Sequence, residues 1–441
     1  MSDSTKPARG MRDFLPDDLR RRTYVIGVIE DVFQRYGFQP LETPAVENIE
    51  TLLGKYGEEG DRLIFKILKR GEGRQTGDTD LALRYDLTVP LARVIAEYRG
   101  KLPQFFRRYQ IQPVWRADRP QRGRFREFYQ CDVDVIGSRS MLVEAELCAA
   151  TCDVLTRLGF NDFVIRLNHR GLLRGLLDSA GVPLSHHISA LIALDKLDKV
   201  GREGVLNELT GRGIADEVAR KALESLSGGL SRLGVLMLGH EEGTRALEEV
   251  ETIIALSANT SAGRHLHPDL SLARGLSYYT GAIFEVAVPD LAGSLGGGGR
   301  YDNLIGMFSG EQVPACGFSL GLERILVVMG ERGMFPADTT SGGVDVMATI
   351  WNAERIADAL ALAGELRAAG LRVEVYPEAD KLGKQIKYAS TRGARFVTIE
   401  GDDERARGEV TVKNLTTGEQ TAIPRSGVAA WLDARRSSTR S

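Results

Sequence analysis

Residues 107–126 form the most basic stretch of the chain, and their types suit phosphate binding. The segment holds seven arginines and a single acidic residue, Asp118. Arg116 and Arg124 lie between two strand-like runs and close in sequence to Phe128. Guanidinium groups make paired hydrogen bonds to phosphate oxygens, and an aromatic ring offers a face on which a base can stack. A charge cluster is more often a solvated surface, but the apolar strands on both sides favour an anion-binding hairpin.

A second group of polar residues precedes a stretch with the alternation of a buried strand. The sequence 272–286, LARGLSYYTGAIFEV, places Arg274 and Gly275 just ahead of Tyr278 and Tyr279. A phenol hydroxyl both donates and accepts hydrogen bonds, and a guanidinium stays charged at any relevant pH. The pattern therefore predicts a cation and two phenols at the mouth of a strand, and raises the question of which ligand they face.

Asp86 and Thr88 stand two residues apart in LALRYDLTVPLAR, a stretch that we expect to be a strand. Alternate residues of a strand face the same side. The carboxylate and the hydroxyl could together hold an ammonium group, or they could be an ordinary polar pair at the end of a strand. The residues alone leave both interpretations open.

Two further segments are weak signals by themselves. Residues 296–299 are four consecutive glycines, which predict a tight turn or a close backbone approach to another strand or to a ligand. They do not form a Walker loop, because no Gly-Lys-Ser/Thr follows. Arg324 is expected in a helix that begins after Gly321, where either an ion pair with Glu323 or ligand binding would explain it.

The composition is that of an ordinary globular chain. At 441 residues it is too long for one core, so two or three domains are expected. The formal net charge is −3, so a nucleic acid would have to be met by local basic patches. We find no apolar leader and no run of about 18 apolar residues, and expect a cytoplasmic protein without a membrane segment. Cys148 and Cys152 predict packed core thiols rather than half a metal site, and the six histidines are expected at the surface or in loops.

Hydrophobic periodicity predicts the elements that position these residues. We expect an amphipathic helix over 17–36, an extended edge segment over 38–47, and two pairs of strands in the next 90 or so residues. From Val164 to Ser277 there is no Phe, Trp or Tyr, although the chain has 30 of them, and the periodicity there is helical. This change predicts a helical insert between two parts of a β-rich domain. After a linker at 335–343, the pattern alternates as β-α-β-α-β and ends with a hairpin and a short helix.

These segments, in this order, resemble the histidyl-tRNA synthetases of class II. The helix that ends in YGFQPLETPAVE is similar to class II motif 1, VWRADRPQRGRFREFYQCDVDVIG to motif 2, and GFSLGLERIL to motif 3. More specific are ALRYDLTVPLAR and RGLSYYTGAIFE, which resemble two signatures of the histidine enzymes. The resemblance implies an α+β fold with a class II antiparallel-sheet catalytic domain formed by residues 1–170 and 263–334. A helical insertion domain would span 171–262, and a C-terminal α/β anticodon-binding domain would span 342–441.

The resemblance also implies how ATP is bound. Arg116, on the α-phosphate, and Arg124 would hold the phosphates, Phe128 would stack on adenine, and Arg324 would contact the γ-phosphate and the other face of the base. Arg274 would stabilise the charge that develops on the α-phosphoryl oxygens, which makes Arg274 and Arg116 the expected catalytic residues. Mg²⁺ would accompany the ATP phosphates, and no metal held by protein side chains is expected.

The implied histidine pocket combines three kinds of contact. A carboxylate, a hydroxyl and an amide would bind the α-ammonium group, a carboxylate and a phenol would read the two imidazole nitrogens, and further phenols would shape the pocket. The implied residues are, in that order, Asp86, Thr88 and Gln130, then Asp134 and Tyr279, then Tyr278 and Tyr301, with Arg274 beside the reacting carboxylate.

The implied macromolecular partners are histidine tRNA and a second copy of the chain. Gln121 and Arg122, in the motif 2 loop, would contact the acceptor end of the tRNA, and the C-terminal domain would contact the anticodon. Two positions depart from the usual family pattern, namely Ser277 in place of an aspartate and Asp118 in place of a glutamate.

Two other functions fit parts of the sequence. A synthetase-like regulatory subunit of the phosphoribosyltransferase of histidine biosynthesis would bind histidine without charging tRNA. Such subunits lack the C-terminal domain and tend to lose the ATP-binding arginines, which this chain keeps. A ligase of another specificity, such as a prolyl or glycyl enzyme, is disfavoured by RGLSYYTG.

Overall fold

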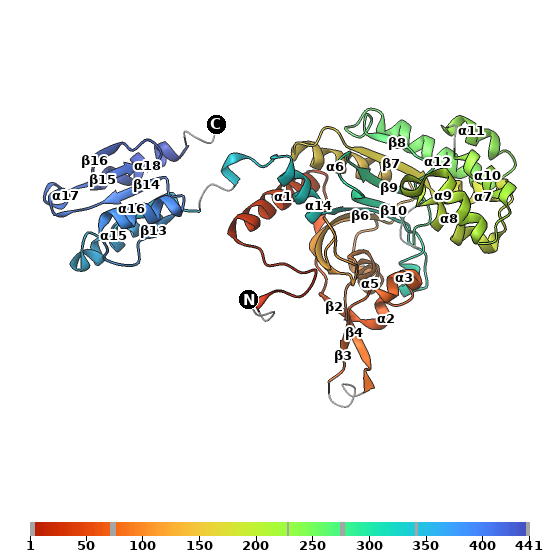
Figure 1. Cartoon of the computed structure of the whole chain (residues 1–441), viewed down its shortest axis with the longest axis horizontal. Helices are drawn as coiled ribbons and strands as arrows, with labels where there is room; N and C mark the ends of the chain where they lie inside the picture. The colour runs from red at the N-terminus through yellow and green to blue at the C-terminus, as the bar shows by residue number, and fades with distance from the viewer. Residues whose placement is uncertain (1–4, 71–75, 227–228, 274–277, 340–342, 438–441) are drawn as a thin grey trace. The chain divides into compact units, whose positions relative to one another are not determined.

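The structure is a computed structural model, and it describes residues 5–70, 76–226, 229–273, 278–339 and 343–437. The chain folds into two compact units, Met1–Phe335 and Pro336–Ser441 (Figure 1). No helix within the described ranges has both the length and the apolar character needed to cross a membrane.

The first unit is built on an eight-stranded sheet. Most neighbouring strands are antiparallel, and the pairs β1–β5 and β7–β8 are parallel. The strands follow the spatial order β1 (Gln39–Pro40), β5 (Phe106–Trp115), β6 (Glu127–Ile136), β11 (Ala315–Gly321), β10 (Ser294–Arg300), β9 (Ala282–Ala287), β7 (Val164–His169) and β8 (Leu266–Pro268). The expected antiparallel sheet is confirmed, and β1 with Pro40 lies at its edge.

One face of this sheet is covered by three helices, α1 (Pro16–Arg35), α6 (Leu142–Arg157) and α14 (Leu322–Glu331). The apolar stripe predicted for 17–36 is buried against the sheet, as Val25 and Ile29 show. Cys148 and Cys152 are fully buried in α6, so the prediction of packed thiols is confirmed. Apolar residues of β6 complete this core.

The other face carries a second core around α5 (Thr88–Tyr98). Beside it, β2 (Val46–Asn48), β4 (Thr79–Leu83) and β3 (Lys66–Leu68) form a small sheet that extends away from the main body (Figure 1). Short helices α2 (Ile49–Leu52), α3 (Gly57–Arg62), η2 (Arg99–Lys101) and α13 (Gly306–Ser309) complete this part.

The expected strand through Asp86 and Thr88 is wrong. Strand β4 ends at Leu83, and Thr88 is the first residue of α5. The Asp86 carboxylate accepts a hydrogen bond from the backbone N–H of Val89, at 3.0 Å, and so satisfies a donor of the first helical turn. A local polar contact of this kind favours the start of a helix over continued extension.

Helices follow β7 over most of the next 90 residues, and Figure 1 draws them together at one side of the first unit. They are α7 (Arg170–Ala180), η3 (Leu184–His186), α8 (His187–Leu194), α9 (Leu197–Gly211), α10 (Asp216–Ser225), α11 (Gly229–Leu236) and α12 (Glu241–Ser257). Three histidines expected at the surface or in loops are buried, namely His265 in a turn and two others in regular elements. His169 ends β7 with its ring 2.9 Å from Glu249, and His187 lies in α8 with its ring 3.0 Å from the Val182 carbonyl.

The second unit holds a five-stranded sheet in the order β13 (Val373–Val375), β12 (Val346–Ala348), β14 (Phe396–Ile399), β15 (Glu409–Asn414) and β16 (Gln420–Pro424). The first three strands are parallel and are connected by α15 (Ile356–Ala368) and α16 (Leu382–Thr391), so the predicted β-α-β-α-β order is confirmed. The remaining elements are η4 (Ala337–Thr339), η5 (Ala353–Arg355), α17 (Asp402–Arg407), η6 (Arg425–Gly427) and α18 (Val428–Ser437).

The four glycines at 296–299 form the middle of β10 and not a turn. A Cβ at Gly298 would lie 2.1 Å from the Gly317 carbonyl oxygen of β11, and one at Gly299 would lie 2.6 Å from the Ala282 carbonyl oxygen. The run therefore allows β10 to approach the backbones of both neighbouring strands, which was one of the two alternatives for this motif.

Candidate active site

The face of β5 and β6 opposite the three helices carries a row of polar side chains. In β6, residues 131, 133 and 135 enter the apolar core, so Gln130, Asp132 and Asp134 face the other way. The register places Gln112, Gln110 and Arg108 of β5 directly across from them, in that order. Arg108, Asp132 and Asp134 are at most 2% exposed. This row is the floor of the candidate site.

Asp134 is held from two sides. The Tyr301 hydroxyl donates to its Oδ1 at 2.6 Å, and Arg108 Nη2 lies 2.9 Å from its Oδ2. Burial raises the pKa of Asp134 above its ordinary value, and Arg108 opposes that rise. Gly317 of β11 is paired with Asp134 of β6, and a Cβ at residue 317 would lie 1.9 Å from Asp134 Oδ1. Asp134 can therefore occupy this place only because residue 317 has no side chain.

Asp86 lies at the beginning of α5, fully buried, and accepts three hydrogen bonds. Oδ1 accepts from the Tyr56 hydroxyl at 2.9 Å and from the Val89 N–H, and Oδ2 accepts from the Tyr278 hydroxyl at 3.0 Å. Burial raises the pKa of Asp86. Tyr278 belongs to the segment RGLSYYTG, so the structure brings this distant segment to Asp86.

The aromatic rings of the site stand edge to face. Tyr278 is 5.2 Å from Tyr279 and 6.0 Å from Tyr301, measured between ring centroids. Burial raises the pKa of each phenol, so all three stay protonated hydrogen-bond donors at neutral pH. The Thr88 hydroxyl also interacts with the Tyr278 phenol. The predicted aspartates and tyrosines thus form one connected group.

Arg116 follows β5 and lies next to this group. Its Nε donates to the Tyr85 carbonyl oxygen at 3.0 Å, one residue before Asp86. Its guanidinium carbon lies 4.3 Å from the Tyr85 ring centroid and 5.1 Å from that of Phe128. The arginine thereby joins the polar row to the loop between β5 and β6.

Arg124 and Asp118 make a forked ion pair within that loop. Nε and Nη2 of Arg124 donate to the two carboxylate oxygens at 2.9 and 2.7 Å. Asp118 is 7% exposed, whereas the Arg124 side chain is 44% exposed. A buried carboxylate thus fixes the direction of an accessible guanidinium.

Arg324 reaches the same loop from the first turn of α14. Nη1 donates to the Ser294 carbonyl oxygen, and Nε lies 3.4 Å from the Gly123 carbonyl oxygen. Glu323 does not pair with its neighbour. It accepts from Arg22 at 2.8 Å and from the Tyr129 N–H at 2.9 Å, so the alternative of an Arg324–Glu323 ion pair is wrong.

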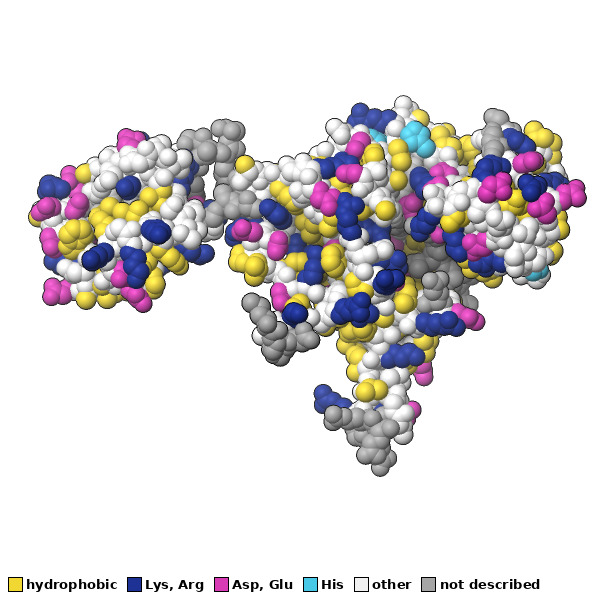
Figure 2. Space-filling view, in the orientation of Figure 1, with side chains coloured by type: hydrophobic (Ala, Val, Ile, Leu, Met, Phe, Trp, Pro, Cys, Tyr) yellow, Lys and Arg dark blue, Asp and Glu magenta, His cyan; other side chains and the backbone are white. Residues whose placement is uncertain are grey.

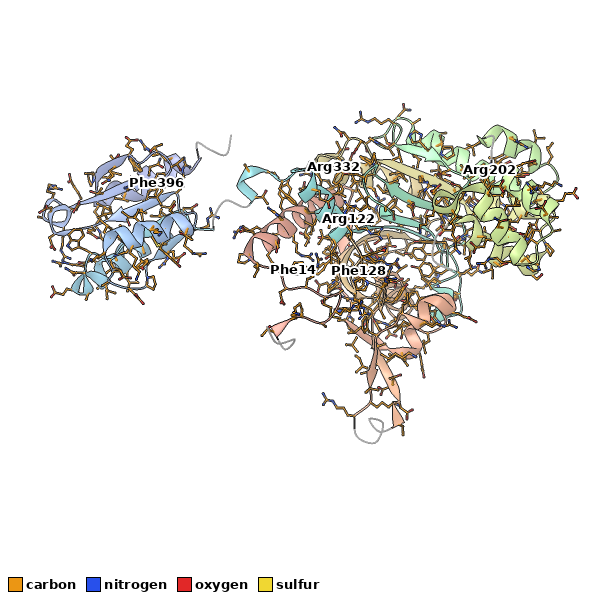
Figure 3. The ribbon with its side chains drawn as sticks, viewed as in Figure 1. Phe14, Arg122, Phe128, Arg202, Arg332 and Phe396 are labelled. Carbon is orange, nitrogen blue, oxygen red and sulfur yellow. The ribbon has the colours of Figure 1, made fainter. Side chains whose placement is uncertain are left out.

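The tip of the loop is a tight two-stranded turn, in which Gln121 and Arg124 exchange backbone hydrogen bonds at 2.9 and 3.1 Å. Gln121 is exposed. Arg122 pairs with Glu331 at the end of α14 and donates to the Asp290 carbonyl oxygen at 3.2 Å. Figure 3 shows Arg122 and Phe128 in the central part of the first unit, and Figure 2 shows several Lys and Arg side chains on this face.

The predicted residues therefore form two adjoining sets. Three of the four arginines, with Phe128, surround the loop after β5, and the aspartates and tyrosines line the floor beside it. Arg274 lies outside the described residues, as do Gly275 and Ser277. Gln130 is part of the floor, where its Nε2 donates to Ser319 at 3.0 Å.

Three polar residues of the site were not predicted from the sequence, namely Arg108, Asp132 and Tyr56. Arg108 and Asp132 repeat the period-two alternation of β5 and β6, which was the available signal. Their significance comes from the pairing register, which one sequence does not reveal. Tyr56 contacts Asp86 across 30 positions of chain, and no local pattern marks it.

Comparison with known proteins shows which families and proteins the chain is similar to. Residues 10–325 match the family model described as histidyl-tRNA synthetase, and residues 344–435 match the model of an anticodon binding domain. The chain is 41% identical to the histidine–tRNA ligase of Christiangramia forsetii, over 96% of this chain and 98% of that protein. It is 43% identical to the histidine–tRNA ligase of Gloeobacter violaceus, over 94% and 95%. A crystal structure of the histidyl-tRNA synthetase from Nostoc superposes with a TM-score of 0.82 at 32% identity, covering 98% of this chain and 99% of that one.

Proposed function

The chain belongs to the histidyl-tRNA synthetase family, and from this premise we propose that it activates histidine with ATP and transfers it to the 3′ end of histidine tRNA. The observation that carries this proposal is the junction of two sites through Arg116. A buried group of carboxylates suits a cationic amino acid, and the arginine-lined loop beside it suits a polyphosphate.

Activation joins the two substrates at the α-phosphorus. A carboxylate oxygen of histidine attacks this atom, an O–P bond forms, and the bond to the bridging oxygen breaks as pyrophosphate leaves. Arg116, Arg124 and Arg324 would hold the phosphates, and Phe128 would stack on adenine. The ion pair with Asp118 supports this assignment, because it fixes Arg124 before the nucleotide arrives.

Arg274 would stabilise the transition state of this step. Negative charge gathers on the α-phosphoryl oxygens, and a fixed guanidinium can pair with two of them without further reorganisation. Mg²⁺ would enter as the companion of the ATP phosphates, and so belongs to the substrate.

The floor of the site would recognise histidine through the hydrogen-bond donors of the amino acid. Asp86, Thr88 and Gln130 would take the α-ammonium group, and Asp134 with Tyr279 would take the two ring nitrogens. The Tyr301 and Arg108 contacts support the role of Asp134, because they fix the carboxylate that a ring N–H would meet. An amino acid without these ring nitrogens would leave buried polar groups unsatisfied and would be rejected.

In the second step a hydroxyl of the terminal ribose attacks the carbonyl carbon of the adenylate, and AMP leaves. Gln121 and Arg122 would meet the acceptor end. We assign residues 1–170 and 263–334 to the catalytic domain, 171–262 to an insertion domain, and 342–441 to the domain that meets the anticodon. We further propose a cytoplasmic homodimer. Exposed apolar side chains of the small sheet, such as Leu68 at 54% and Val46 at 39%, support an association that covers them.

The test is ATP–pyrophosphate exchange with each of the twenty amino acids in turn. We expect exchange with histidine alone. Exchange driven by another amino acid, or none with histidine, would contradict the proposal. Light scattering of the purified chain tests the homodimer, and a monomer at micromolar concentration would contradict that part.

A further inference from the structure

Asp132 is a buried carboxylate to which the family resemblance assigns no role. It lies in the middle of β6 and points to the same face as its second neighbours, Gln130 and Asp134. It is 2% exposed. A carboxylate is rarely buried to this extent without a partner of opposite charge, so its surroundings call for a physical explanation.

The groups that face Asp132 do not neutralise it. From β5, Arg108 Nη2 lies 3.9 Å from Asp132, but 2.9 Å from Asp134. From β6 and from the start of α5 come two further carboxylates, Asp134 and Asp86, and from β9's leading segment comes the neutral phenol of Tyr279. Arg108 is the guanidinium nearest to Asp132 and Asp134, while Arg116 lowers the pKa of Asp86 and Arg84 interacts electrostatically with Asp132.

Strand β11 and the segment before α5 supply the remaining neighbours. The Ser319 hydroxyl of β11 hydrogen-bonds to Asp132 and lowers its pKa, while Arg84 is engaged with the Thr43 and Pro113 carbonyl oxygens. Among the described residues no three His, Cys, Asp or Glu side chains converge as metal ligands do. Arg108, at 3.9 Å, is the one salt-bridge partner of Asp132 among the described residues, and a cationic ligand would add a closer one.

Within the described ranges of the chain, the floor holds unpaired acceptors together with two unpaired donors, Nε and Nη1 of Arg108. Asp132 Oδ1 and Gln130 Oε1 are buried and have no hydrogen-bond partner among the described residues. The Asp86 carboxylate, by contrast, already accepts three hydrogen bonds from protein donors. A carboxylate has about four acceptor positions, so Asp86 can offer little more than one to a ligand.

We propose that Asp132 binds the α-ammonium group of the amino acid, with its Oδ1 as a hydrogen-bond acceptor beside Gln130. An ammonium group has three donors. Asp86 accepts one, Gln130 Oε1 a second and Asp132 Oδ1 the third, in place of Thr88, whose hydroxyl interacts with Tyr278. Asp132 is then an affinity-determining residue of the pocket, and this assignment rests on the proposed function.

The assignment predicts a dependence of binding on pH. Burial raises the pKa of Asp132 to about 7, and the neighbouring Asp134 raises it as well, while Arg108 opposes them. An ammonium ligand requires the ionised carboxylate, so its binding releases a proton and weakens as the pH falls from 8 to 6. Asp86 and Asp134 interact electrostatically with Asp132, so they also contribute to the pH dependence of binding. The decisive comparison is therefore between the pH dependence of the wild-type chain and that of Asp132→Asn.

The experiment measures inhibition of histidine-dependent pyrophosphate exchange by two probes. L-Histidinol keeps the ammonium group and the ring, and imidazolepropionate keeps the ring and the carboxylate but has no ammonium group. In Asp132→Asn at pH 8 we expect the inhibition constant of histidinol to rise about 10- to 100-fold, as for loss of a charge-assisted hydrogen bond. That of imidazolepropionate should stay within about threefold. The histidinol constant of the variant should also lose most of the pH dependence seen in the wild type.

Each other outcome overturns the assignment. Equal weakening of both probes would place Asp132 at the ring, and no weakening of either would leave it without a ligand role. Thermal unfolding at pH 8 excludes a merely structural role, because removing an uncompensated buried charge should leave the midpoint unchanged or higher. A lower midpoint together with unchanged inhibition would contradict the proposal.

Two controls separate this proposal from the proposed function. Asp216→Asn removes an exposed carboxylate of α10 that is paired with Arg220 at 2.7 Å. The inhibition constants of both probes for this variant should equal those for the wild type. A wild-type chain without histidine-dependent exchange would contradict the proposed function. A wild-type chain that exchanges, with an Asp132→Asn variant that binds histidinol equally well, would contradict only the role of Asp132.

Discussion

Gly317 offers a direct perturbation of the polar row on β5 and β6, because it lies opposite Asp134 in the pairing of β11 with β6. In Gly317→Ala the added Cβ would stand 1.9 Å from Asp134 Oδ1 and 2.6 Å from its Cγ. Carbon and oxygen atoms that are not bonded need roughly 3 Å or more in a packed interior, so the carboxylate or the strand has to move by about 1 Å.

The contacts of Asp134 set the size of the effect. The same carboxylate accepts from Tyr301 at 2.6 Å and lies 2.9 Å from Arg108. A hydrogen bond to a charged group contributes about 1.5–3 kcal/mol. Loss of one such contact, with part of the second, should lower the free energy of unfolding of the first unit by about 2–5 kcal/mol. The KM for histidine should rise by at least about tenfold.

Urea unfolding and pyrophosphate exchange measure the two effects separately. The KM for ATP should change little, because a Cβ at Gly317 would meet Asp134 and Val133 and not the arginines proposed to bind ATP. Gly330→Ala is the matched control in α14, since a Cβ there has no heavy atom within 4 Å. It should stabilise the helix by up to about 1 kcal/mol. A Gly317→Ala chain with wild-type stability and KM for histidine would refute the reasoning.

Three further substitutions test other parts of the structure. Arg274→Ala should slow adenylate formation in single-turnover experiments far more than it weakens ATP binding, and equal losses would make Arg274 a binding residue only. Glu144→Ala removes the forked partner of Arg300, at 2.6 and 2.8 Å, and should lower the free energy of unfolding by about 3 kcal/mol or more; a smaller loss in urea unfolding would show that the remaining partners suffice. Phe128→Ala should raise the KM for ATP about tenfold and leave that for histidine unchanged, whereas an unaltered KM for ATP would exclude stacking on adenine.

The local sequence pattern was sufficient to predict secondary structure where hydrophobic periodicity and turn residues determine it. Alternating strands and helices of the second unit carry regular periodicity and clear turn residues, and the structure has them in the predicted order. The exception is α17, whose six residues are too short for a periodic signal. Its first turn is held by the Glu404 carboxylate, which accepts from the Gly401 N–H at 3.1 Å.

The secondary structure or burial of a residue was predicted wrongly where a contact with a distant residue, or with the first turn of a helix, determines it. Asp86 reads as part of a strand, but its carboxylate binds the first turn of a helix and two tyrosines from elsewhere in the chain. His169 was expected at the surface or in a loop. It is buried because the carboxylate of Glu249, 80 positions further along the chain, lies 2.9 Å from its ring. Such contacts depend on the assembled fold, and one sequence does not contain them in local form.

Aminoacylation of a histidine tRNA transcript by the full chain is the decisive measurement, because it requires amino-acid activation, transfer and recognition of the RNA together. We expect the transcript to be charged with histidine, and proline and glycine transcripts incubated with their own amino acids to stay uncharged. A chain that supports histidine-dependent pyrophosphate exchange but leaves the histidine transcript uncharged would contradict this expectation.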